Sequence, residues 1–330
     1  MAEQIRAGLI GAGSMANAVH YPSLAELPHV EMVALCDLAP EKRETSAARF
    51  GISRTYTDYR EMLDREEIDA VWVLMPPHHL FNIVVECARR KKHVFVEKPP
   101  GVTYEQARMM ALACEANGVL GMCGFNRRYI PLLQQCRERV EERGGIFQCV
   151  STFYKFYVEG KPYYDGATDI LTCDAVHSVD LLRWMGGEPA QVASDVARRC
   201  NTFDDAFNAL LRFESGATGV LLANWCVGAR AHTFEMHGRG ISVFADPDVR
   251  ALIYTDGKPE PEVLTTQEAA GSDARHHYYG FHAENRHFIE CIREGRQPSS
   301  SLADSAKTLR LVNQIYASPI DPSAPRWPGG

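Results

Sequence analysis

Short apolar runs alternate with longer amphipathic stretches over the first part of the chain. The apolar runs are rich in Val, Ile and Leu, and most of them end near a Gly, Pro or Asp. Between them, apolar residues recur three or four positions apart, which is the period of a helix that buries one face. The predicted strands are 5–10, 30–36, 54–56, 70–75, 93–96 and 121–125, and the predicted helices are 14–24, 40–50, 80–90 and 103–117. Strands and helices that alternate in this way favour a parallel, doubly wound α/β sheet.

The alternation ends near Val150. Beyond it, apolar strands follow one another with turns that contain glycine, which favours antiparallel hairpins. The strands are predicted at 208–213, 219–224, 234–238 and 242–245, the helices at 132–142, at 177–185 and twice after Gly280, and a loop at 265–274. A wide apolar sheet with no obvious second layer of helices favours oligomerisation through its outer face.

Length and composition agree with a globular protein of two domains. At 330 residues the chain exceeds the size at which one hydrophobic core usually stops growing. It is 45% hydrophobic and 23% charged, and its net charge of -7 has the wrong sign for a nucleic-acid partner. No run of about 18 apolar residues occurs, so no membrane span is expected.

The ten cysteines indicate a reducing compartment. None of them forms a CxxC pair of the kind that zinc sites and redox motifs use, and most lie within apolar segments. The N-terminal residues also lack the basic region, apolar stretch and cleavage site of a signal peptide. We therefore expect a cytoplasmic protein with reduced thiols and no bound metal.

The turn after the first predicted strand has the pattern of a dinucleotide site. Gly11-Ala12-Gly13-Ser14-Met15-Ala16 fits G-x-G-x-x-G/A. Glycine lets the backbone approach a pyrophosphate, and the next helix points its N-terminus at the phosphate charge. Asp37, at the end of the second strand, can accept hydrogen bonds from the ribose hydroxyls and would repel a 2′-phosphate, so NAD is favoured over NADP. Lys42 and Arg43 could accept that phosphate if the loop bent.

Three further motifs carry a resemblance to a known family. They are Met75-Pro76-Pro77-His78-His79, Val94-Phe95-Val96-Glu97-Lys98-Pro99 and His177-Ser178-Val179-Asp180-Leu181-Leu182-Arg183-Trp184. With the glycine-rich turn and Asp37, they resemble the glucose-fructose oxidoreductase / inositol dehydrogenase / rhizopine catabolism (Gfo/Idh/MocA) family over nearly the whole chain. The resemblance implies an NAD(P)-binding Rossmann domain over 1–124. It also implies an α+β domain for substrate binding and oligomerisation over 125–330, with a large, mostly antiparallel open sheet and a last helix near 301–318.

The resemblance also implies an activity and two catalytic residues. Family members oxidise or reduce a hydroxyl or carbonyl carbon in sugars, polyols and related compounds. Lys98 is implied to lie beside the nicotinamide and the reacting oxygen, and His177 is implied to act as the acid/base. The chemistry agrees, because oxidation of an alcohol needs a base for the hydroxyl proton and a cation near the developing alkoxide. Lys98 also follows a parallel strand, at the edge where open α/β sheets bind ligands.

Asp174 is the candidate partner of His177. If one helix carries both residues, a spacing of three puts them on the same face, and the carboxylate can orient the imidazole. Many relatives have an aspartate four residues before the histidine, where this chain has Cys173. Either Asp174 takes that role at a different angle, or the substrate subclass and part of the mechanism differ. Asp180 is expected to be structural, paired with Arg183.

Further contacts complete the predicted site. Leu80 stands where many relatives have a histidine, and no residue near His78 and His79 has the spacing of a metal site. Polar and aromatic side chains near the domain junction and in the second half are candidates for sugar contacts. Cofactor contacts are expected from Gly11, Gly13, Ser14, Met15, Asp37, Met75, Pro76, His79, Glu97, Lys98 and Asn126, and substrate contacts from Arg127, Lys155 and Tyr164.

Three functions are compatible with these residues. The first is an NAD(H)-dependent dehydrogenase or reductase with a carbohydrate-like substrate. The second is an NAD-dependent glycosidase of the same family, which would oxidise its substrate transiently with the same residues. The third is a dinucleotide-binding regulator, which needs no acid/base group, so the presence of Lys98 and His177 favours hydride transfer. The substrate, the reacting carbon, the direction of the reaction and the choice between homodimer and homotetramer do not follow from the sequence.

Overall fold

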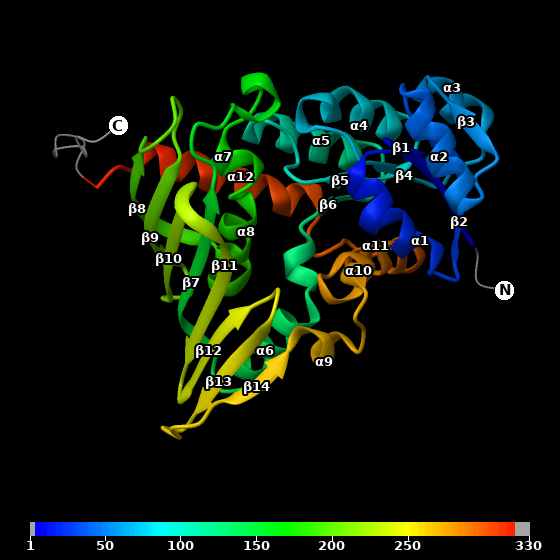
Figure 1. The fold of residues 1–330 in the computed structure, drawn as a ribbon. Coiled ribbons are helices and arrows are strands. Elements are labelled where there is room, and N and C mark those ends of the chain that lie inside the picture. The colour runs from blue at the N-terminus through cyan, green and yellow to red at the C-terminus, as the bar shows by residue number, and fades with distance from the viewer. Residues whose placement is uncertain (1–3, 321–330) are drawn as a thin grey trace. The chain divides into compact units, whose positions relative to one another are not determined.

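The chain folds into two compact units. The computed structural model describes residues 4–320, and its helices and strands are labelled in Figure 1. The first unit comprises the described residues up to Asn126 together with Ala274–Lys307. The second comprises Arg127–Asp273 together with the described residues from Thr308 onward. None of the described helices is long and apolar enough to cross a membrane.

A six-stranded sheet forms the centre of the first unit. Its order is β3-β2-β1-β4-β5-β6, and each neighbouring pair is parallel. The strands are β1 Ile5–Ile10, β2 Val30–Cys36, β3 Arg54–Tyr56, β4 Ala70–Val73, β5 His93–Glu97 and β6 Gly121–Gly124. The predicted parallel, doubly wound sheet is confirmed. Its strand order reverses between β1 and β4, and open α/β sheets bind ligands outside the carboxyl ends of the strands at such a point.

Helices connect the strands of this sheet. They are η1 Ala16–His20, α1 Tyr21–Ala25, α2 Pro40–Phe50, α3 Tyr59–Arg65, η2 Pro77–His79, α4 Leu80–Arg89 and α5 Tyr104–Ala116. The sequence pattern did not predict α3, a short helix capped by the side chain of Asp58. The first helix runs without a break from Ser14 to Ala25, and its middle part, η1, is a π-helical segment. Such segments are frequent at functional sites.

The chain returns to the first unit after residue 273. The returning segment contains α10 Arg275–Tyr278, α11 Phe281–Glu294 and the beginning of α12 Leu302–Ala317. Nε1 of Trp72 in β4 donates to Oδ1 of Asn285 in α11 at 2.7 Å, and the rings of Trp72 and Phe288 pack edge to face. The sequence analysis assigned this segment to the second domain, because apolar periodicity predicts a helix but does not say which sheet that helix covers.

The second unit contains an eight-stranded sheet. Its order is β14-β13-β12-β11-β7-β10-β9-β8. The strands are β7 Ile146–Phe156, β8 Pro189–Ala197, β9 Ala206–Phe213, β10 Thr218–Asn224, β11 Cys226–Gly238, β12 Ile241–Asp246, β13 Arg250–Thr255 and β14 Glu262–Thr265. The predicted large, mostly antiparallel sheet is confirmed. At its centre, however, β7 and β10 are parallel, so the strands do not form a simple series of hairpins.

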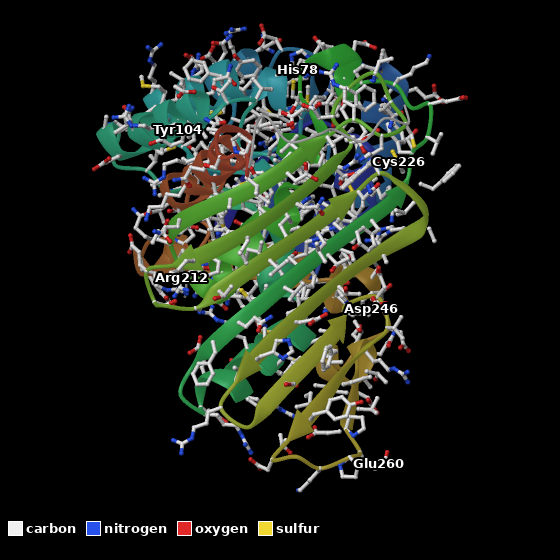
Figure 2. The ribbon with its side chains drawn as sticks, turned by 90° about the vertical axis from the view of Figure 1, so that its left-hand side faces the viewer. His78, Tyr104, Arg212, Cys226, Asp246 and Glu260 are labelled. Carbon is white, nitrogen blue, oxygen red and sulfur yellow. The ribbon has the colours of Figure 1, made fainter. Side chains whose placement is uncertain are left out.

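Two helices pack on one face of this sheet. α6 Pro131–Glu141 contacts β11, β12 and β13, and α8 Val176–Gly186 contacts β7 and β10. Side chains along β10 alternate between buried and half-buried positions, as a sheet covered on one side requires. The other face is turned toward the viewer in Figure 2, where the described helices leave its strands uncovered.

Shorter elements complete the second unit. They are η3 Asn126–Tyr129, which begins at the end of the first unit, η4 Tyr163–Gly166, α7 Ile170–Cys173 and α9 Thr266–Ala270. The prediction of a loop at 265–274 is wrong for α9. Thr265 Oγ1 accepts from the backbone N–H of Glu268, whose carboxylate accepts from the backbone N–H of Thr265, and this capping box starts a helix within a polar segment.

Candidate functional site

The turn between β1 and the first helix is built around Gly11. Its φ is +99°, and a Cβ added there would lie 2.6 Å from the carbonyl oxygen of Leu74 and 2.9 Å from Sδ of Met75. Glycine adopts this backbone conformation without steric cost and leaves that space empty. Oη of Tyr21 donates to the carbonyl oxygen of Gly11 at 2.6 Å. The turn is therefore held tightly against the segment that follows β4.

Gly13 lies on the open side of the same turn. A Cβ built there meets no atom within 4 Å among the described residues. Nδ2 of Asn17 donates to the carbonyl oxygens of Ala12 and Gly13 at 3.0 and 3.2 Å, which fixes the loop. The helix begins at Ser14, and Met15 is 41% exposed. An open glycine backbone before a helix N-terminus fits the pyrophosphate of a dinucleotide, which needs close backbone approach and N–H donors.

Asp37 lies against this turn from the end of β2. Its Oδ2 accepts from the backbone N–H of Ala12 at 2.7 Å, and its Oδ1 accepts from the backbone N–H of Ala39 at 2.8 Å. Each carboxylate oxygen has a further lone pair, which is what a ribose diol requires. Nη1 of Arg43 donates to the main-chain oxygen of Asp37 at 2.9 Å, so this cation is held on the backbone. The arrangement fits the ribose of NAD better than a 2′-phosphate.

Glu97 and Lys98 stand at the carboxyl end of β5. Oε2 of Glu97 accepts from the backbone N–H of Lys98 at 2.9 Å, and Oε1 accepts from Nε2 of His20 at 2.7 Å. Burial by itself would raise the pKa of Glu97, but the hydrogen bond from His20 and the nearby charge of Lys98 lower it below its usual value. Glu97 is therefore an ionised carboxylate that fixes the backbone carrying the Lys98 side chain.

A chain of hydrogen bonds fixes the tautomer of His20. The indole N–H of Trp72 can only donate, so the Asn285 atom that faces it is the amide oxygen Oδ1. This contact fixes the orientation of the Asn285 amide. Nδ2 of Asn285 then donates to Nδ1 of His20 at 3.2 Å, and Nε2 of His20 carries the proton donated to Glu97. The sequence analysis did not identify His20 or Asn285. Nothing in the pattern links residues that are 265 positions apart.

The other predicted cofactor residues follow the ends of β4 and β6. Met75 and Pro76 are half-buried after β4, and His79 is exposed, with its ring 4.0 Å from that of His78. Asn126 follows β6 and is 1% exposed. Its Nδ2 donates to the carbonyl oxygen of Tyr279 at 2.8 Å, so this part of the amide holds the returning segment of the first unit.

In the second unit, His177 lies in the first turn of α8 beside Arg127. Nη1 of Arg127 donates to Nε2 of His177 at 2.6 Å, and both side chains are buried. A guanidinium has donors only, so Nε2 of His177 presents a lone pair in this arrangement. An imidazole in this form can act as a general base. The sequence analysis named both residues but did not predict their contact.

Asp174 lies outside the helix that carries His177. α7 ends at Cys173, Asp174 has φ -117° and ψ -52°, and α8 begins at Val176. The prediction that a single helix presents both residues on one face is therefore wrong. The break lies at Asp174, where φ departs from the helical value and the backbone N–H of Ala175 bonds back to the carbonyl oxygen of Ile170 at 2.9 Å, which ends the single turn of α7.

The carboxylate of Asp174 gathers Lys155 and Tyr163 around it. Its Oδ2 forms an ion pair with Nζ of Lys155 in β7 and accepts from Oη of Tyr163 at 3.0 Å. Nε1 of Trp225 donates to the same Oη at 3.1 Å. Burial and the nearby Asp174 charge raise the pKa of Tyr163, so the phenol stays protonated. A cation, a carboxylate and a phenol beside an aromatic ring form the kind of surface that binds sugar hydroxyls.

Of the two adjacent tyrosines, it is Tyr163 that bonds to Asp174. Tyr164, the predicted substrate residue, is 47% exposed. Its φ of +49° and the φ of +54° at Asp165 place two consecutive non-glycine residues in the left-handed region. That conformation costs free energy and persists where the surrounding structure holds it, often near functional sites. A substrate contact for Tyr164 stays a prediction.

Asp180 is the buried partner of Arg128. Nε and Nη2 of Arg128 donate to its two carboxylate oxygens at 2.7 and 2.6 Å, and Oγ1 of Thr308 donates at 2.8 Å. Arg183, the expected partner, donates to the hydroxyl of the same Thr308 and to Glu188. Asp180 thus joins η3, α8 and α12, which agrees with the structural role expected for it.

A second buried histidine, His232 in β11, was not identified from the sequence. Its ring is stacked on Phe153 at a centroid distance of 3.9 Å, and its Nε2 lies 3.1 Å from Oγ of Ser178. Burial, reinforced by nearby cations that include Arg127, lowers the pKa of His232 well below its usual value. His232 is therefore neutral near pH 7.

The fold and the glycine turn define a class of protein. A parallel sheet in the order 3-2-1-4-5-6, with a turn that fits a pyrophosphate and a carboxylate that fits a ribose, binds a dinucleotide. A lysine at the carboxyl end of β5 adds a cation of the kind that can stabilise a developing alkoxide. The class is a dinucleotide-dependent oxidoreductase.

Comparison with known proteins identifies the family. Residues 5–125 match the oxidoreductase family with an NAD-binding Rossmann fold, and residues 134–243 match the GFO/IDH/MocA C-terminal domain. The chain belongs to the Gfo/Idh/MocA family, as its motifs indicated, and it is an NAD(H)-dependent oxidoreductase.

Individual relatives resemble the chain over nearly its whole length. An uncharacterized oxidoreductase of Rhizobium meliloti, ORF334, is 33% identical over 333 residues, which cover 95% of this chain and 96% of that protein. D-apiose dehydrogenase of Paraburkholderia graminis is 26% identical over 332 residues, which cover 96% of this chain and 88% of that protein. The solved structure of levoglucosan dehydrogenase in complex with NADH and levoglucosan matches with a TM-score of 0.84 at 22% identity, covering 96% and 97% of the two chains. At that identity the likeness concerns the fold.

Proposed function

We propose that the protein is a dehydrogenase or reductase that acts on a CH–OH or carbonyl carbon of a sugar, polyol or related small molecule. The observation that carries this proposal is the Glu97–Lys98 pair, held by His20 at the carboxyl end of β5. Bound NAD would accept or supply the hydride. The substrate class is supported by the family and by relatives named D-apiose dehydrogenase and levoglucosan dehydrogenase.

Lys98 is the proposed electrostatic catalyst. An alcohol that loses hydride and proton passes through a state with negative charge on its oxygen, and a fixed ammonium group stabilises that charge. Glu97 fixes the Lys98 backbone through its Oε2 atom, and His20 fixes Glu97 in turn. The hydrogen-bonded chain therefore positions the cation before a substrate arrives.

His177 is the proposed acid/base. In the oxidation direction, the lone pair on Nε2 takes the hydroxyl proton, and in the reduction direction the protonated ring returns it. Arg127 donates to that same nitrogen, so a substrate hydroxyl has to replace the Arg127 contact. His177→Gln should lower kcat by about 100-fold or more, and in the oxidation direction it should remove the fall of kcat/KM at low pH that protonation of the base causes.

Asp174, Lys155 and Tyr163 are the proposed substrate-binding group. Because Asp174 bonds to Lys155 and Tyr163, we assign it to orienting them and not to fixing the tautomer of His177. Lys155→Met and Tyr163→Phe should raise KM more than they lower kcat. Lys161→Met, at an exposed lysine of the adjoining loop, is the matched control and should change neither constant.

The decisive experiment combines cofactor binding with turnover. The protein is titrated with NADH and NADPH by fluorescence and then screened by nicotinamide absorbance against D-apiose, levoglucosan, inositols and keto-sugars. NADH binding with net oxidation or reduction of one compound supports the dehydrogenase. If NADH binds without net turnover, hydrolysis of a glycoside only in the presence of NAD supports the glycosidase. If no glycoside is hydrolysed either, the result supports the regulator. Absence of binding overturns the assignment of the glycine turn.

The outer face of the eight-stranded sheet is the proposed homo-oligomer interface. The strand registers align one continuous row of outward-facing side chains across it, and most of them are apolar. The row consists of Ala193, Leu210, Val220, Val150, Glu235, Phe244, Leu252 and Val263. Exposed apolar patches of this extent mark association surfaces. Leu210→Lys with Phe244→Lys should convert the oligomer to a monomer in light scattering, and an unchanged mass would contradict the interface.

A cytoplasmic location is proposed from the thiols. All ten cysteines are free, and eight of them are buried. Free thiols of this number are stable where the compartment is reducing. Fractionation of the native host tests the location, and recovery with secreted proteins would contradict it.

A further inference from the structure

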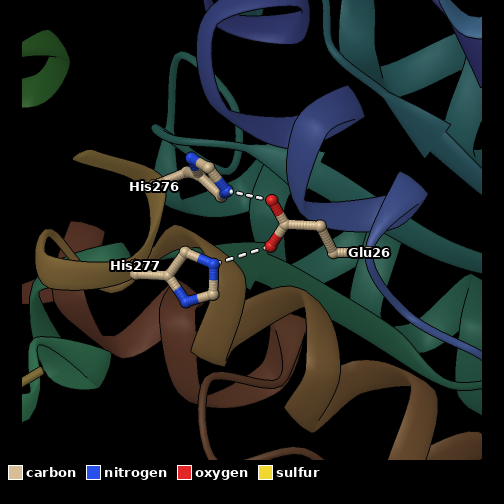
Figure 3. Close-up of side chains that lie close together, drawn as sticks. All are labelled: Glu26, His276 and His277. Atoms are coloured by element: carbon tan, nitrogen blue, oxygen red, sulfur yellow. Dashed lines mark hydrogen bonds and ion pairs between the residues drawn. The ribbon is translucent and has the colours of Figure 1, made fainter. Parts of the chain in front are cut away.

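Three polar side chains from distant parts of the chain converge at one point of the first unit (Figure 3). Glu26 directly follows α1, and His276 and His277 belong to the single-turn helix α10. Nε2 of His276 lies 2.8 Å from Oε1 of Glu26, and Nε2 of His277 lies 2.6 Å from Oε2. One ligand atom from each of the three residues lies within 4.8 Å of the corresponding atoms of the other two.

We propose that Glu26, His276 and His277 bind a divalent transition-metal ion of the Zn²⁺ type. Two imidazoles and one carboxylate are a known zinc ligand set, and imidazole nitrogen selects Zn²⁺, Ni²⁺ or Cu²⁺ over Mg²⁺ and Ca²⁺. This inference is independent of the proposed reaction, because none of the three residues belongs to the site assigned above.

The ligand atoms, which lie within 4.8 Å of one another, have to move to the spacing of a bound ion. With bonds of about 2.0–2.1 Å at a tetrahedral ion, neighbouring ligand atoms lie about 3.3 Å apart. The two nitrogen–oxygen distances of 2.8 and 2.6 Å must therefore lengthen by roughly 0.5–0.7 Å. The side chains have room to do so, since those of Glu26, His276 and His277 are 44%, 15% and 30% exposed.

A third histidine stands next to the cluster. Nε2 of His282, in the first turn of α11, lies 4.0 Å from Oε2 of Glu26. Its ring is stacked on that of His277 at a centroid distance of 4.3 Å. His282 lies outside the group of converging ligand atoms, so its side chain has to move to supply the fourth ligand that would complete a closed site of the structural kind.

The position of the cluster suggests what the ion would do. Glu26 and His276 are separated by 250 positions in the sequence, and the histidines lie where the chain re-enters the first unit. An ion at this point would tie the returning segment to α1. No metal was expected from the sequence because neither the cysteines nor the residues near His78 and His79 have the spacing of a metal site, and a ligand so distant in sequence gives no motif.

The test is metal titration of the full-length, tag-free protein after chelator treatment. We expect one equivalent of Zn²⁺ to bind, a Tm raised by about 3 °C or more, and visible absorption bands of a tetrahedral site with Co²⁺. Mg²⁺ should produce none of these effects. The three readouts do not depend on catalytic activity.

Two variants and a matched control assign the site. Glu26→Gln and His277→Ala should each weaken Zn²⁺ binding at least about tenfold, whereas His237→Ala should leave it unchanged. His237 is the control because it also pairs with a carboxylate, Glu235 at 3.2 Å, without a second histidine in that pair. Unchanged circular dichroism and NADH affinity show that the variants are folded. If the wild-type protein binds no Zn²⁺, or if the two variants bind it as tightly as the wild type, the three side chains form only a hydrogen-bonded ion pair and the proposal fails.

Discussion

Two arginine–aspartate pairs in the second unit have the same chemistry and opposite burial. In the first, the side chains of Arg128 and Asp180 are 6% and 1% exposed. In the second, those of Arg143 and Asp256 are 35% and 58% exposed. Both pairs are bidentate, with contacts of 2.7 and 2.6 Å in the buried pair and 2.7 and 3.0 Å in the exposed pair. The same substitution in each pair therefore isolates the effect of burial.

Asp180→Asn should be strongly destabilising. It keeps the shape of the side chain but removes the charge that compensates the buried Arg128 guanidinium. Loss of one partner of a buried ion pair costs about 3–5 kcal/mol. For a unit of this size, each kcal/mol lowers Tm by about 2–4 °C, so a decrease of about 6–20 °C is expected. Asp256→Asn should leave Tm unchanged within error, because water and salt screen the exposed charges and asparagine tolerates the left-handed backbone at that position.

Thermal unfolding followed by circular dichroism, with urea midpoints on the same samples, measures both effects. The reasoning would be refuted if Asp180→Asn unfolded within about 2 °C of the wild type, or if Asp256→Asn were equally destabilising. A large loss of activity in Asp180→Asn without loss of stability would instead move Asp180 from the structural to the catalytic group.

Three further predictions concern the cofactor turn, the lysine and a buried histidine. Lys98→Ala should lower turnover by about 100-fold or more and change the Kd for NADH by less than about tenfold, so full activity in steady-state assays would contradict the catalytic assignment. Gly11→Ala should lower both Tm and NADH affinity, because the added Cβ would meet a carbonyl oxygen. Gly13→Ala should leave Tm unchanged and weaken NADH binding by about tenfold or more. Thermal melting and fluorescence titration of both variants distinguish the two effects. The depressed pKa of His232 means that the unfolded chain binds a proton below about pH 6.5 that the folded protein excludes. Stability should therefore be complete above that pH and fall by up to about 1.4 kcal/mol per unit as pH decreases below it, and urea unfolding of His232→Phe should show a weaker pH dependence.

The repeating part of the fold followed directly from the sequence. β1, β2 and α2 have the predicted bounds, because a buried parallel strand is a continuous apolar run and an amphipathic helix has a distinct period. α3 escaped prediction because it is a single short helix on a polar segment. The parallel pairing of β7 with β10 escaped it because adjacency in a sheet is a property of chain topology.

The candidate site also contains residues that the sequence predicted and residues that it did not. Gly11, Asp37 and Lys98 could be predicted because each stands where a strand ends, and the end of a strand is visible in the sequence. Their supporting residues could not. His20 reaches Glu97 across 77 positions, and Arg127 reaches His177 across 50. The spacing of polar residues within a segment carries no information about such contacts.

The error over Asp174 shows why local spacing is unsafe for polar pairs. A separation of three puts two side chains on one face only if the helix is continuous, and here the backbone departs from helical geometry at Asp174, between α7 and α8. The carboxylate thereby turns to Lys155 and Tyr163, while Arg127 occupies Nε2 of His177. The break thus separates the carboxylate that we propose for hydroxyl recognition, Asp174, from the imidazole that we propose for proton transfer, His177, which one continuous helix would have joined. Under this proposal, a substrate with several hydroxyl groups uses both, since one hydroxyl loses its proton while others bind the charged and phenolic groups.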